Sequence, residues 1–379
     1  MTTFAVVTGG GTAGHVLPAM AIAESLVDAG HAPSEIHYVG AQRGIETRLL
    51  PTTPFPCTFL DVVGLQRELN PRNVRLNATM VPKMAAASRR ANALLRRLRP
   101  QVVVSVGGYA SLPTVLVARR LGVPIVVVSY DRRPGRASSL AARLAVACAV
   151  AFADSPLPRA VVTGAPVRRR ILAVDRDRDR EAARRELGLP ADRFVVAVTG
   201  GSQGSSALNE AVAAFVAGHH GDTGLAVRQV VGDRFLATSP APRDGSDGVV
   251  HQIVGYDDRI ELLYAAADLF IGRGGASTVA EVAVTGTPSI LVPWSAAADD
   301  HQTSNVSWLS EQGAAILLAE PELAGLGELI DALRADPSQL AELGERAAAA
   351  GALHRSGAIV DVIEQAAATG GRSRDPASS

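Results

Sequence analysis

A histidine stands at the end of a glycine-rich stretch close to the start of the chain. Residues 4–8 are apolar and predict a buried strand, and the connection after them carries Gly9, Gly11, Gly14 and finally His15. Glycine lets the backbone come close to a ligand, and the partial positive charge of a helix N-terminus attracts anions. An imidazole beside such a cradle changes protonation near neutral pH and can act as a general base. The stretch therefore predicts phosphate binding next to a group that moves a proton.

A second glycine-rich loop, Thr199–Gly204, follows a strand in the other half of the chain. Ser202 can donate a hydroxyl hydrogen bond to a phosphate while neighbouring amides supply others, although a tight strand-to-helix turn would use the same glycines. Glu281 lies several residues into the helix after Gly274-Gly275, where a carboxylate can accept both hydroxyls of a ribose or be an ordinary exposed helix residue. Two phosphate-type loops in opposed domains favour a ligand held between them.

The first glycine loop also matches the G-x-G-x-x-G pattern of dinucleotide-binding folds. That interpretation requires an acidic residue at the tip of the second strand to hold a ribose. Here the second strand, residues 36–39, runs into Gly40-Ala-Gln-Arg43 without a carboxylate. An NAD(P)-dependent oxidoreductase is therefore a remote alternative, and His15 itself can also be a helix N-terminal residue without a catalytic task.

A cluster of polar residues near position 300 has the composition of a metal-ligand set. Mixed Asp and His spacing of this kind is more typical of a solvated helix start, and nothing else in the sequence completes a site. We therefore expect no metal. The residues concerned are Asp299, Asp300, His301, Gln302 and Asn305.

The composition is that of a globular enzyme with more than one domain. The chain has 379 residues, which is long for one core, and 47% of them are hydrophobic and 20% charged. Its formal net charge is zero, so nothing in the totals favours nucleic-acid binding. Cys57 and Cys148 are too few for a disulfide framework or a zinc site. No signal peptide or membrane-spanning helix is expected, which predicts a cytoplasmic protein with at most a peripheral attachment.

Short apolar runs alternate with helical stretches along the chain, which predicts α/β domains with parallel, doubly wound sheets. A helix that Pro18 can start follows the first strand, and the strand–glycine loop–helix pattern restarts in the second half. We expect two Rossmann-like domains facing one another, residues 1–163 and 164–368, with the last helix able to pack back on the first domain. A disordered tail is expected over 369–379. The expected strands are 4–8, 36–39, 57–63, 102–106, 123–128, 194–198, 226–231, 249–254, 269–271 and 289–292.

Residues 65–100 are helical in composition, strongly basic and interleaved with apolar residues such as Met80 and Leu94. Such a helix can lie on anionic lipid, where each basic residue contributes about 1 kcal/mol, whereas a solvated basic face is the plainer interpretation. We favour the lipid surface. The basic residues are Arg67, Arg72, Arg75, Lys83, Arg89, Arg90, Arg96, Arg97 and Arg99.

Seven motifs in order along the chain resemble those of the MurG family, the UDP-N-acetylglucosamine (UDP-GlcNAc) transferases of peptidoglycan synthesis in glycosyltransferase family 28. The resemblance implies a GT-B fold and an inverting transfer of GlcNAc to the C4 hydroxyl of the muramyl sugar of lipid I (undecaprenyl-pyrophosphoryl-MurNAc-pentapeptide), which gives lipid II. It also implies peripheral attachment to the cytoplasmic face of the cell membrane. The motifs are GGGTAGH at 9–15, VGAQRGIE at 39–46, VGGYAS at 106–111, GAPVR at 164–168, GGSQGSSALN at 200–209, RGGASTVAE at 273–281 and DDHQTSN at 299–305.

The resemblance further implies a role for individual residues. His15 would be the general base, Arg168 and Ser202 would meet the UDP phosphates, Glu281 the ribose and Gln302 the donor sugar. No cofactor is implied, because a helix N-terminus and an arginine stabilise the leaving diphosphate. The first domain would bind the acceptor and the membrane, and the second would bind UDP-GlcNAc. The full implied set of substrate contacts is Thr12, Ala13, Gly14, Gly107, Gly108, Tyr109, Asp131, Arg168, Ser202, Gln203, Gly204, Asp257 (to uracil, through its backbone), Gly275, Ala276, Glu281, Gln302 and Asn305.

One segment departs from the family. Where the family carries H-E-Q-N before a Pro-Gly pair, this chain has Val128-Ser-Tyr-Asp131. Asp131 adds negative charge near an anionic pyrophosphate, which weakens binding unless cations such as Arg132 and Arg133 offset it. The loss of the family's glutamate at Ser129 affects acceptor handling more than donor handling. A related GT-B enzyme with another lipid or small-molecule acceptor is therefore the nearest alternative, and a non-catalytic nucleotide-sugar-binding module is a further one.

Overall fold

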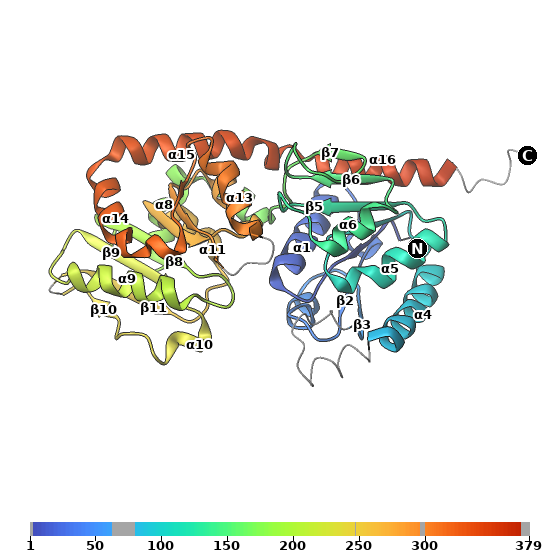
Figure 1. Cartoon of the computed structure of the whole chain (residues 1–379), viewed down its shortest axis with the longest axis horizontal. Helices are drawn as coiled ribbons and strands as arrows, with labels where there is room; N and C mark the ends of the chain where they lie inside the picture. Colours follow the sequence, from blue (N-terminus) through green and yellow to red (C-terminus); the bar gives the residue numbers. More distant parts are fainter. Residues whose placement is uncertain (1–2, 63–79, 247, 296–299, 373–379) are drawn as a thin grey trace, which may run out of the picture. The chain divides into compact units, whose positions relative to one another are not determined.

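The computed structural model describes residues 3–62, 80–246, 248–295 and 300–372, and these residues form two compact units (Figure 1). The first unit comprises the chain up to Arg169 together with the segment that starts at Ser356. The second unit runs from Arg170 to Arg355. Each unit is built around its own parallel sheet and its own apolar core.

The first unit has a seven-stranded sheet in the order β3-β2-β1-β4-β5-β6-β7, and every neighbouring pair is parallel. Valine-rich runs form its central strands, as expected for strands that helices cover on both faces. The two last strands, which pair beside β5, were not expected from the sequence. The strands are β1 (Ala5–Thr8), β2 (Ile36–Ala41), β3 (Cys57–Leu60), β4 (Val102–Ser105), β5 (Ile125–Ser129), β6 (Ala147–Val150) and β7 (Ala160–Val162).

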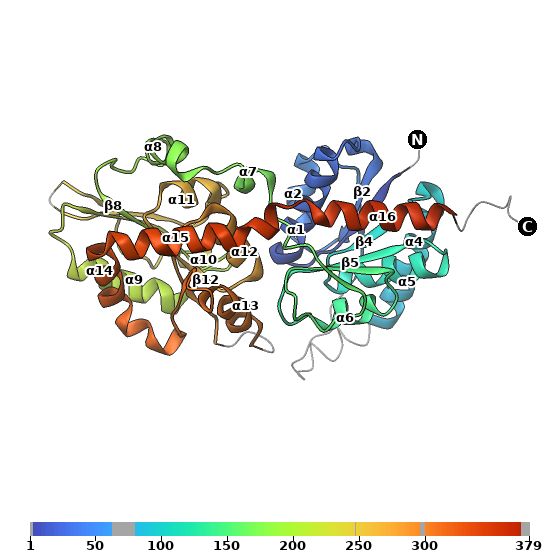
Figure 2. The same cartoon turned by 90° about the horizontal axis from the view of Figure 1, so that it is seen from above.

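Helices cover both faces of this sheet. Alanine, leucine and valine side chains of α4, α5 and α6 are buried in one core cluster with side chains of the strands. The C-terminal helix α16 lies across β4, β5 and β6 and touches α1, and Figure 2 shows it crossing the strands of the first unit. The helices are α1 (Ala13–Asp28), α2 (Glu46–Leu49), α4 (Met80–Leu98), α5 (Leu112–Arg120), α6 (Arg136–Ala142) and α16 (Ala358–Arg372).

The second unit repeats the same plan. Its seven strands follow the order β10-β11-β9-β8-β12-β13-β14, all parallel except β10, which runs antiparallel to β11. The strands are β8 (Phe194–Thr199), β9 (Leu225–Val230), β10 (Arg243–Asp244), β11 (Val250–Val254), β12 (Leu269–Arg273), β13 (Ser289–Val292) and β14 (Ile316–Leu317).

Helices of the second unit pack in pairs on the sheet, α8 with α11, α12 with α15 and α9 with α14. The charged segment from Asp175 to Arg185 is only partly solvated, because Arg184 is 2% exposed and pairs with Asp268 at 2.7 Å. The helices are α7 (Arg169–Leu172), α8 (Arg176–Glu186), α9 (Ser206–Gly218), α10 (Asp233–Leu236), α11 (Ile260–Ala266), α12 (Ala276–Thr285), α13 (His301–Ser310), α14 (Leu326–Ala335) and α15 (Pro337–Gly351).

Each sheet has a point where the chain changes direction of winding, between β1 and β4 in the first unit and between β8 and β12 in the second. Ligands of open α/β sheets bind at the carboxyl ends of the strands at such switch points. The glycine loops singled out in the sequence follow these four strands. The expected parallel, doubly wound architecture is therefore confirmed for both halves, and it places the loops where a ligand is expected.

Three expectations from the sequence concern the C-terminal tail, the basic region and membrane-spanning helices. Helix α16 extends to Arg372, so residues 369–372 are helical rather than disordered, and residues 373–379 lie outside the described part. Arg67, Arg72 and Arg75 also lie outside the described residues. Within the described part of the chain, no helix is both long enough and apolar enough to span a membrane.

Candidate functional site

Helix α1 carries His15 in its first turn. Thr12 is the N-cap residue, with an extended backbone (φ −141°, ψ 156°), and its hydroxyl does not cap the helix. Instead, the Thr12 Oγ1 lies 3.0 Å from Nδ1 of His15. When Nδ1 carries the proton and donates it to Thr12, Nε2 keeps a free lone pair. The N-cap side chain therefore orients the imidazole for use through Nε2.

The helix does not begin at Pro18, as the sequence suggested. It begins at Ala13, and Pro18 lies inside it. Proline has no backbone N–H, so the carbonyl of Gly14, four residues earlier, has no intrahelical partner. The buried Tyr130 hydroxyl donates to this carbonyl instead. Tyr130 thus joins the end of β5 to the first turn of α1, one residue before His15.

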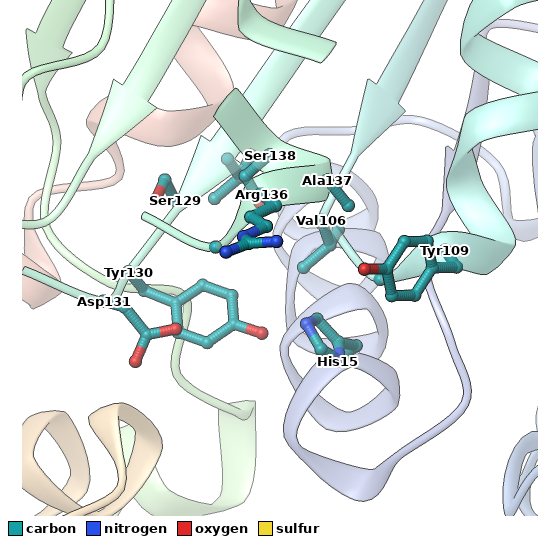
Figure 3. A pocket seen from close by; sticks show the side chains of 12 residues that line it. His15, Val106, Tyr109, Ser129, Tyr130, Asp131, Arg136, Ala137 and Ser138 are labelled. Carbon is teal, nitrogen blue, oxygen red and sulfur yellow. The ribbon is translucent and has the colours of Figure 1, made fainter. Parts of the chain in front are cut away.

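A cavity of about 210 Å³ opens beside His15 in the first unit (Figure 3). It lies at the switch point of the sheet, because its walls come from α1, from the loop after β4 and from the segment between β5 and α6. The lining residues are His15, Val106, Gly108, Tyr109, Val128, Ser129, Tyr130, Asp131, Gly135, Arg136, Ala137 and Ser138.

The loop after β4 requires its two glycines. Gly107 and Gly108 have φ values of +94° and +76°, which side chains rarely adopt. A Cβ on Gly107 would lie 2.8 Å from Oγ of Ser138 and 3.4 Å from Cδ2 of His15. A Cβ on Gly108 would lie 2.6 Å from the carbonyl oxygen of Gly10. These glycines therefore let the two loops at the switch point meet around His15.

Burial and nearby charges have opposing effects on the pKa of His15. Burial lowers the pKa of His15 below its usual value near 6.5, while the carboxylates of Asp131 and Glu46 raise it in part. The lowered pKa leaves the imidazole neutral near pH 7, which is the form that accepts a proton.

The arginine that lines this cavity is Arg136, a residue that the sequence did not single out. Arg132 pairs with Asp154 at 2.8 Å, and neither Arg132 nor Arg133 is among the residues that line the cavity. Arg136, the first residue of α6, lines it, and Figure 3 shows its guanidinium pointing inward between Tyr130 and Ala137. Sequence reasoning missed this residue. Its position directly after the Pro134-Gly135 pair, close to the segment that departs from the family, was the available signal.

The predicted donor loop of the second unit lies at the N-terminus of α9. Ser202 and Gln203 are exposed in a turn, and Ser205 caps the helix by accepting from the Leu208 N–H at 3.3 Å. Gly204 has φ +66°, and a Cβ there would lie 2.1 Å from the carbonyl oxygen of Val231. The loop thus offers a hydroxyl and backbone amides on its exposed side.

Glu281 lies in α12, the helix that begins with Gly275 as N-cap and Ala276 as first residue. It is 8% exposed and accepts from the Tyr264 hydroxyl at 2.9 Å, so the alternative of an ordinary exposed glutamate is wrong. On α13, Oε1 of Gln302 accepts from the Trp294 N–H at 2.9 Å, and Asn305 is fully buried. The Gln302 amide group is therefore held in a fixed orientation.

Asp257 and Arg168 are two further residues that were predicted to contact the donor. The buried Asp257 side chain pairs with Arg228 and accepts from the Arg259 N–H at 3.1 Å, so the backbone is the part of this residue left for a ligand. Arg168, which is 9% exposed, belongs to the first unit, whereas Ser202 belongs to the second. A shared role of Arg168 and Ser202 at one diphosphate stays a prediction.

The polar cluster near position 300 was weighed as a metal site. Asp300 is the N-cap of α13, and His301 is its first residue. Asp299 lies outside the described residues. Among those that the structure describes, no three His, Cys, Asp or Glu side chains are grouped so that they can hold a metal ion.

Comparison with known proteins identifies relatives of both halves. Residues 5–150 match the glycosyltransferase family 28 N-terminal domain, and residues 195–358 match the family 28 C-terminal domain. Enzymes named UDP-N-acetylglucosamine--N-acetylmuramyl-(pentapeptide) pyrophosphoryl-undecaprenol N-acetylglucosamine transferase are similar over nearly the whole chain. That of Acidothermus cellulolyticus is 38% identical, with 96% of this chain and 98% of the relative covered. That of Desulforudis audaxviator is 36% identical, with 97% and 99% covered.

A solved structure agrees with the fold. The crystal structure of Acinetobacter baumannii MurG covers 96% of this chain and 100% of its own, with a TM-score of 0.70 and 24% identity. The expected GT-B class, with two Rossmann-like parallel-sheet domains, is confirmed.

Proposed function

The chain belongs to glycosyltransferase family 28, and from this membership we propose that it transfers GlcNAc from UDP-GlcNAc to lipid I and thereby forms lipid II in peptidoglycan synthesis. The cavity beside His15 is the observation that carries this proposal. It combines a neutral imidazole held through Nδ1, a cation at Arg136 and glycine loops at the switch point of a sheet. Such a site suits a hydroxyl that must lose its proton next to an anionic group.

We propose that His15 is the general base of the transfer. Nε2 accepts the proton of the muramyl C4 hydroxyl while the hydroxyl oxygen attacks the anomeric carbon of UDP-GlcNAc. The bond between the anomeric carbon and the diphosphate breaks, and UDP leaves with the electron pair. Attack from the face opposite the leaving group inverts the anomeric centre. Thr12 holds the imidazole during this step, and the proton then passes from His15 to solvent.

We propose that UDP-GlcNAc binds to the second unit. The exposed Ser202 hydroxyl and the amides at the start of α9 face a diphosphate, and Arg168 adds positive charge. Glu281, held by Tyr264, accepts from the ribose hydroxyls, and the oriented amide of Gln302 meets the sugar. The other proposed contacts are Gln203, Gly204, the backbone of Asp257, Gly275, Ala276 and Asn305.

We propose that the acceptor binds to the first unit from an anionic membrane surface at the cytoplasmic face. Thr12 to Gly14, Gly107 to Tyr109 and Asp131 surround the acceptor's reacting end, and Arg136 meets its pyrophosphate. Helix α4 presents exposed arginines, including Arg89 and Arg96, opposite a buried apolar stripe, which suits attachment beside anionic headgroups.

A second candidate function is the same transfer to a different acceptor. The four residues that depart from the family motif all line the cavity, namely Val128, Ser129, Tyr130 and Asp131. Their placement favours an effect on acceptor choice. A panel of lipid I analogues and other hydroxyl acceptors at a fixed UDP-GlcNAc concentration separates the candidates, because only the preferred acceptor releases UDP at the highest kcat/KM.

The base assignment is tested by UDP release with UDP-GlcNAc and a lipid I analogue. We expect His15→Ala to lower kcat by roughly 10²- to 10⁴-fold, the usual contribution of a positioned base. His220→Ala, at an exposed histidine of the second unit, is the matched control and should leave kcat unchanged. Undiminished turnover in His15→Ala would show that another group takes the proton.

A further inference from the structure

A buried carboxylate lies beneath the first glycine loop. Glu46, the first residue of α2, is fully buried, and three glycines make room for its side chain. A Cβ on Gly10 would lie 2.3 Å from Oε1 of Glu46, and a Cβ on Gly44 would lie 1.8 Å from Oε2. A Cβ on Gly40 would lie 3.1 Å from Cγ. The backbone is therefore shaped around this carboxylate.

One oxygen of Glu46 connects two elements of the switch point. Oε1 accepts from the Gly11 N–H at 3.0 Å and from the Ala41 N–H at 2.8 Å. Oε2 is buried and has no hydrogen-bond partner among the described residues. The side chain thus ties the loop that leads into His15 to the carboxyl end of β2. A buried carboxylate with one oxygen unpartnered costs free energy, so a purely structural tie would be served better by a neutral side chain.

The same loop has a second support. The hydroxyl of Tyr38, a residue of β2 that is 2% exposed, donates to the carbonyl of Gly9 at 2.7 Å. Burial and the negative charge of Glu46 both raise the pKa of Tyr38 far above its usual value, so the phenol stays a neutral donor. With Tyr38 already holding Gly9, the charge of Glu46 is the property that the loop geometry leaves unexplained.

We propose that Glu46 is a positioning residue that holds Gly11 against β2 and whose negative charge stabilises the imidazolium formed when His15 takes the acceptor's proton. This inference rests on the proposed function of His15. A base gains positive charge as the transfer proceeds, so a fixed negative charge favours the transition state over the ground state. Glu46 takes no proton itself and touches neither substrate.

The other charged and titratable groups around His15 are placed differently from Glu46. Asp131 raises the pKa of His15 more than Glu46 does, but it lines the open cavity together with Arg136, whose charge is opposite in sign. Tyr109 and Tyr130 line it as phenols, and Tyr38 lies behind the loop. Glu46 is the buried member of this set that carries a charge, and it raises the pKa of His15 from behind the loop.

The test measures the pKa of His15 by NMR of its Cε1–H in the substrate-free protein. Glu46→Gln keeps an oxygen for the Gly11 and Ala41 N–H groups and removes the charge, so we expect the His15 pKa to fall by about half a unit to one unit. Glu35→Gln is the control, because Glu35 also accepts a backbone N–H, that of Ala32 at 3.0 Å, but lies at the opposite end of β2. It should leave the His15 pKa unchanged.

Turnover provides the second readout. The acid limb of kcat should move to lower pH in Glu46→Gln, and kcat at the plateau should fall roughly threefold to tenfold. A lower melting temperature with an unmoved His15 pKa and an unmoved acid limb would reduce Glu46 to a structural tie and overturn the inference. Failure of the base assignment is recognised separately, by full activity of His15→Ala.

A second variant covers the case in which Glu46→Gln does not fold. Glu46→Asp keeps the negative charge behind the loop but shortens the side chain that accepts from the Gly11 and Ala41 N–H groups, so the melting temperature should fall while the His15 pKa stays at its wild-type value. A His15 pKa that fell by about half a unit or more in Glu46→Asp would show that the loop geometry and not the charge matters, and would overturn the inference.

Discussion

The two switch points share a backbone plan and differ in what the N-cap side chain does. In the first unit, Thr12 leaves the helix uncapped and engages the imidazole of His15. In the second unit, Ser205 caps α9 through the Leu208 N–H and also accepts from Arg273. In the proposed function, one strand–glycine loop–helix plan serves proton transfer where the N-cap side chain contacts a titratable group, and anion binding where the N-cap side chain caps the helix.

The groups behind the two loops differ in the same sense. A carboxylate and a phenol, Glu46 and Tyr38, support the first loop. Behind the second loop, Arg273 reaches Ser205 and pairs with Glu320, which also accepts from the Ser295 N–H at 3.1 Å. The negative charge of Glu46 matches the positive charge that develops on the proposed base, whereas Arg273 is neutralised by Glu320 and holds the N-cap Ser205 in place.

The largest expected difference between the two units is in pH dependence, which should affect turnover at His15 but not donor binding. Since burial holds the pKa of His15 below 6.5, the neutral base is present above that pKa and is lost as the pH falls through it. We expect kcat to fall about tenfold for each pH unit below the His15 pKa. None of the predicted donor contacts in the second unit is a histidine.

The dissociation constant of UDP-GlcNAc, measured by calorimetry, should therefore stay constant over the range in which kcat declines. If donor affinity fell in parallel with kcat, the proposed division of function, with proton transfer at the first loop and donor binding at the second, would be wrong.

Stability should distinguish the glycines of the two loops. Gly204→Ala places a Cβ 2.1 Å from a backbone carbonyl at φ +66° and should cost about 3 kcal/mol or more of unfolding free energy. Gly11→Ala has φ +95° but no atom within 4 Å, so its strain should cost about 1 kcal/mol.

Both tryptophans, Trp294 and Trp308, lie in the second unit, so their fluorescence in urea follows the Gly204 variant. Far-ultraviolet circular dichroism follows the Gly11 variant. Equal costs would mean that the second loop relaxes away from Val231.

The sequence predicted the repeated strand–loop–helix plan because apolar runs and glycines are local signals. It did not predict contacts that depend on distant residues. Pro18 was expected to start a helix, but the carbonyl that it leaves unpaired is satisfied by Tyr130, 116 residues away in the chain. Arg132, expected with Arg133 to offset the charge of Asp131, also pairs with Asp154, which only the folded sheet brings close. Glu46 stood in a recognised motif, but its burial follows from three glycines that meet only in the fold.

A substitution at the acceptor cavity should affect only the first unit's substrate. Arg136→Ala removes the cavity's inward-pointing cation and should raise the acceptor KM about tenfold, with an effect that weakens as salt is added. The KM for UDP-GlcNAc should not change. Arg132→Ala is the matched control, because Arg132 is paired with Asp154. If Arg132→Ala raised the acceptor KM more than Arg136→Ala does, Arg132 would be the cation that acts on the acceptor, as the sequence suggested.

The two N-cap residues give the smallest and most specific contrast. Thr12→Val keeps the shape and removes the hydroxyl from Nδ1 of His15, so the tautomer with a free Nε2 should lose population and kcat should fall roughly threefold to tenfold. Its melting temperature should barely change, because this hydroxyl caps no backbone group. Ser205→Ala should instead cost about 1 kcal/mol of stability and leave the pH dependence of kcat unaltered. Imidazole ¹⁵N shifts report the tautomer and thermal melts report the cap. If Thr12→Val lowered the melting temperature as much as Ser205→Ala and kept the wild-type tautomer of His15, Thr12 would be a helix cap like Ser205.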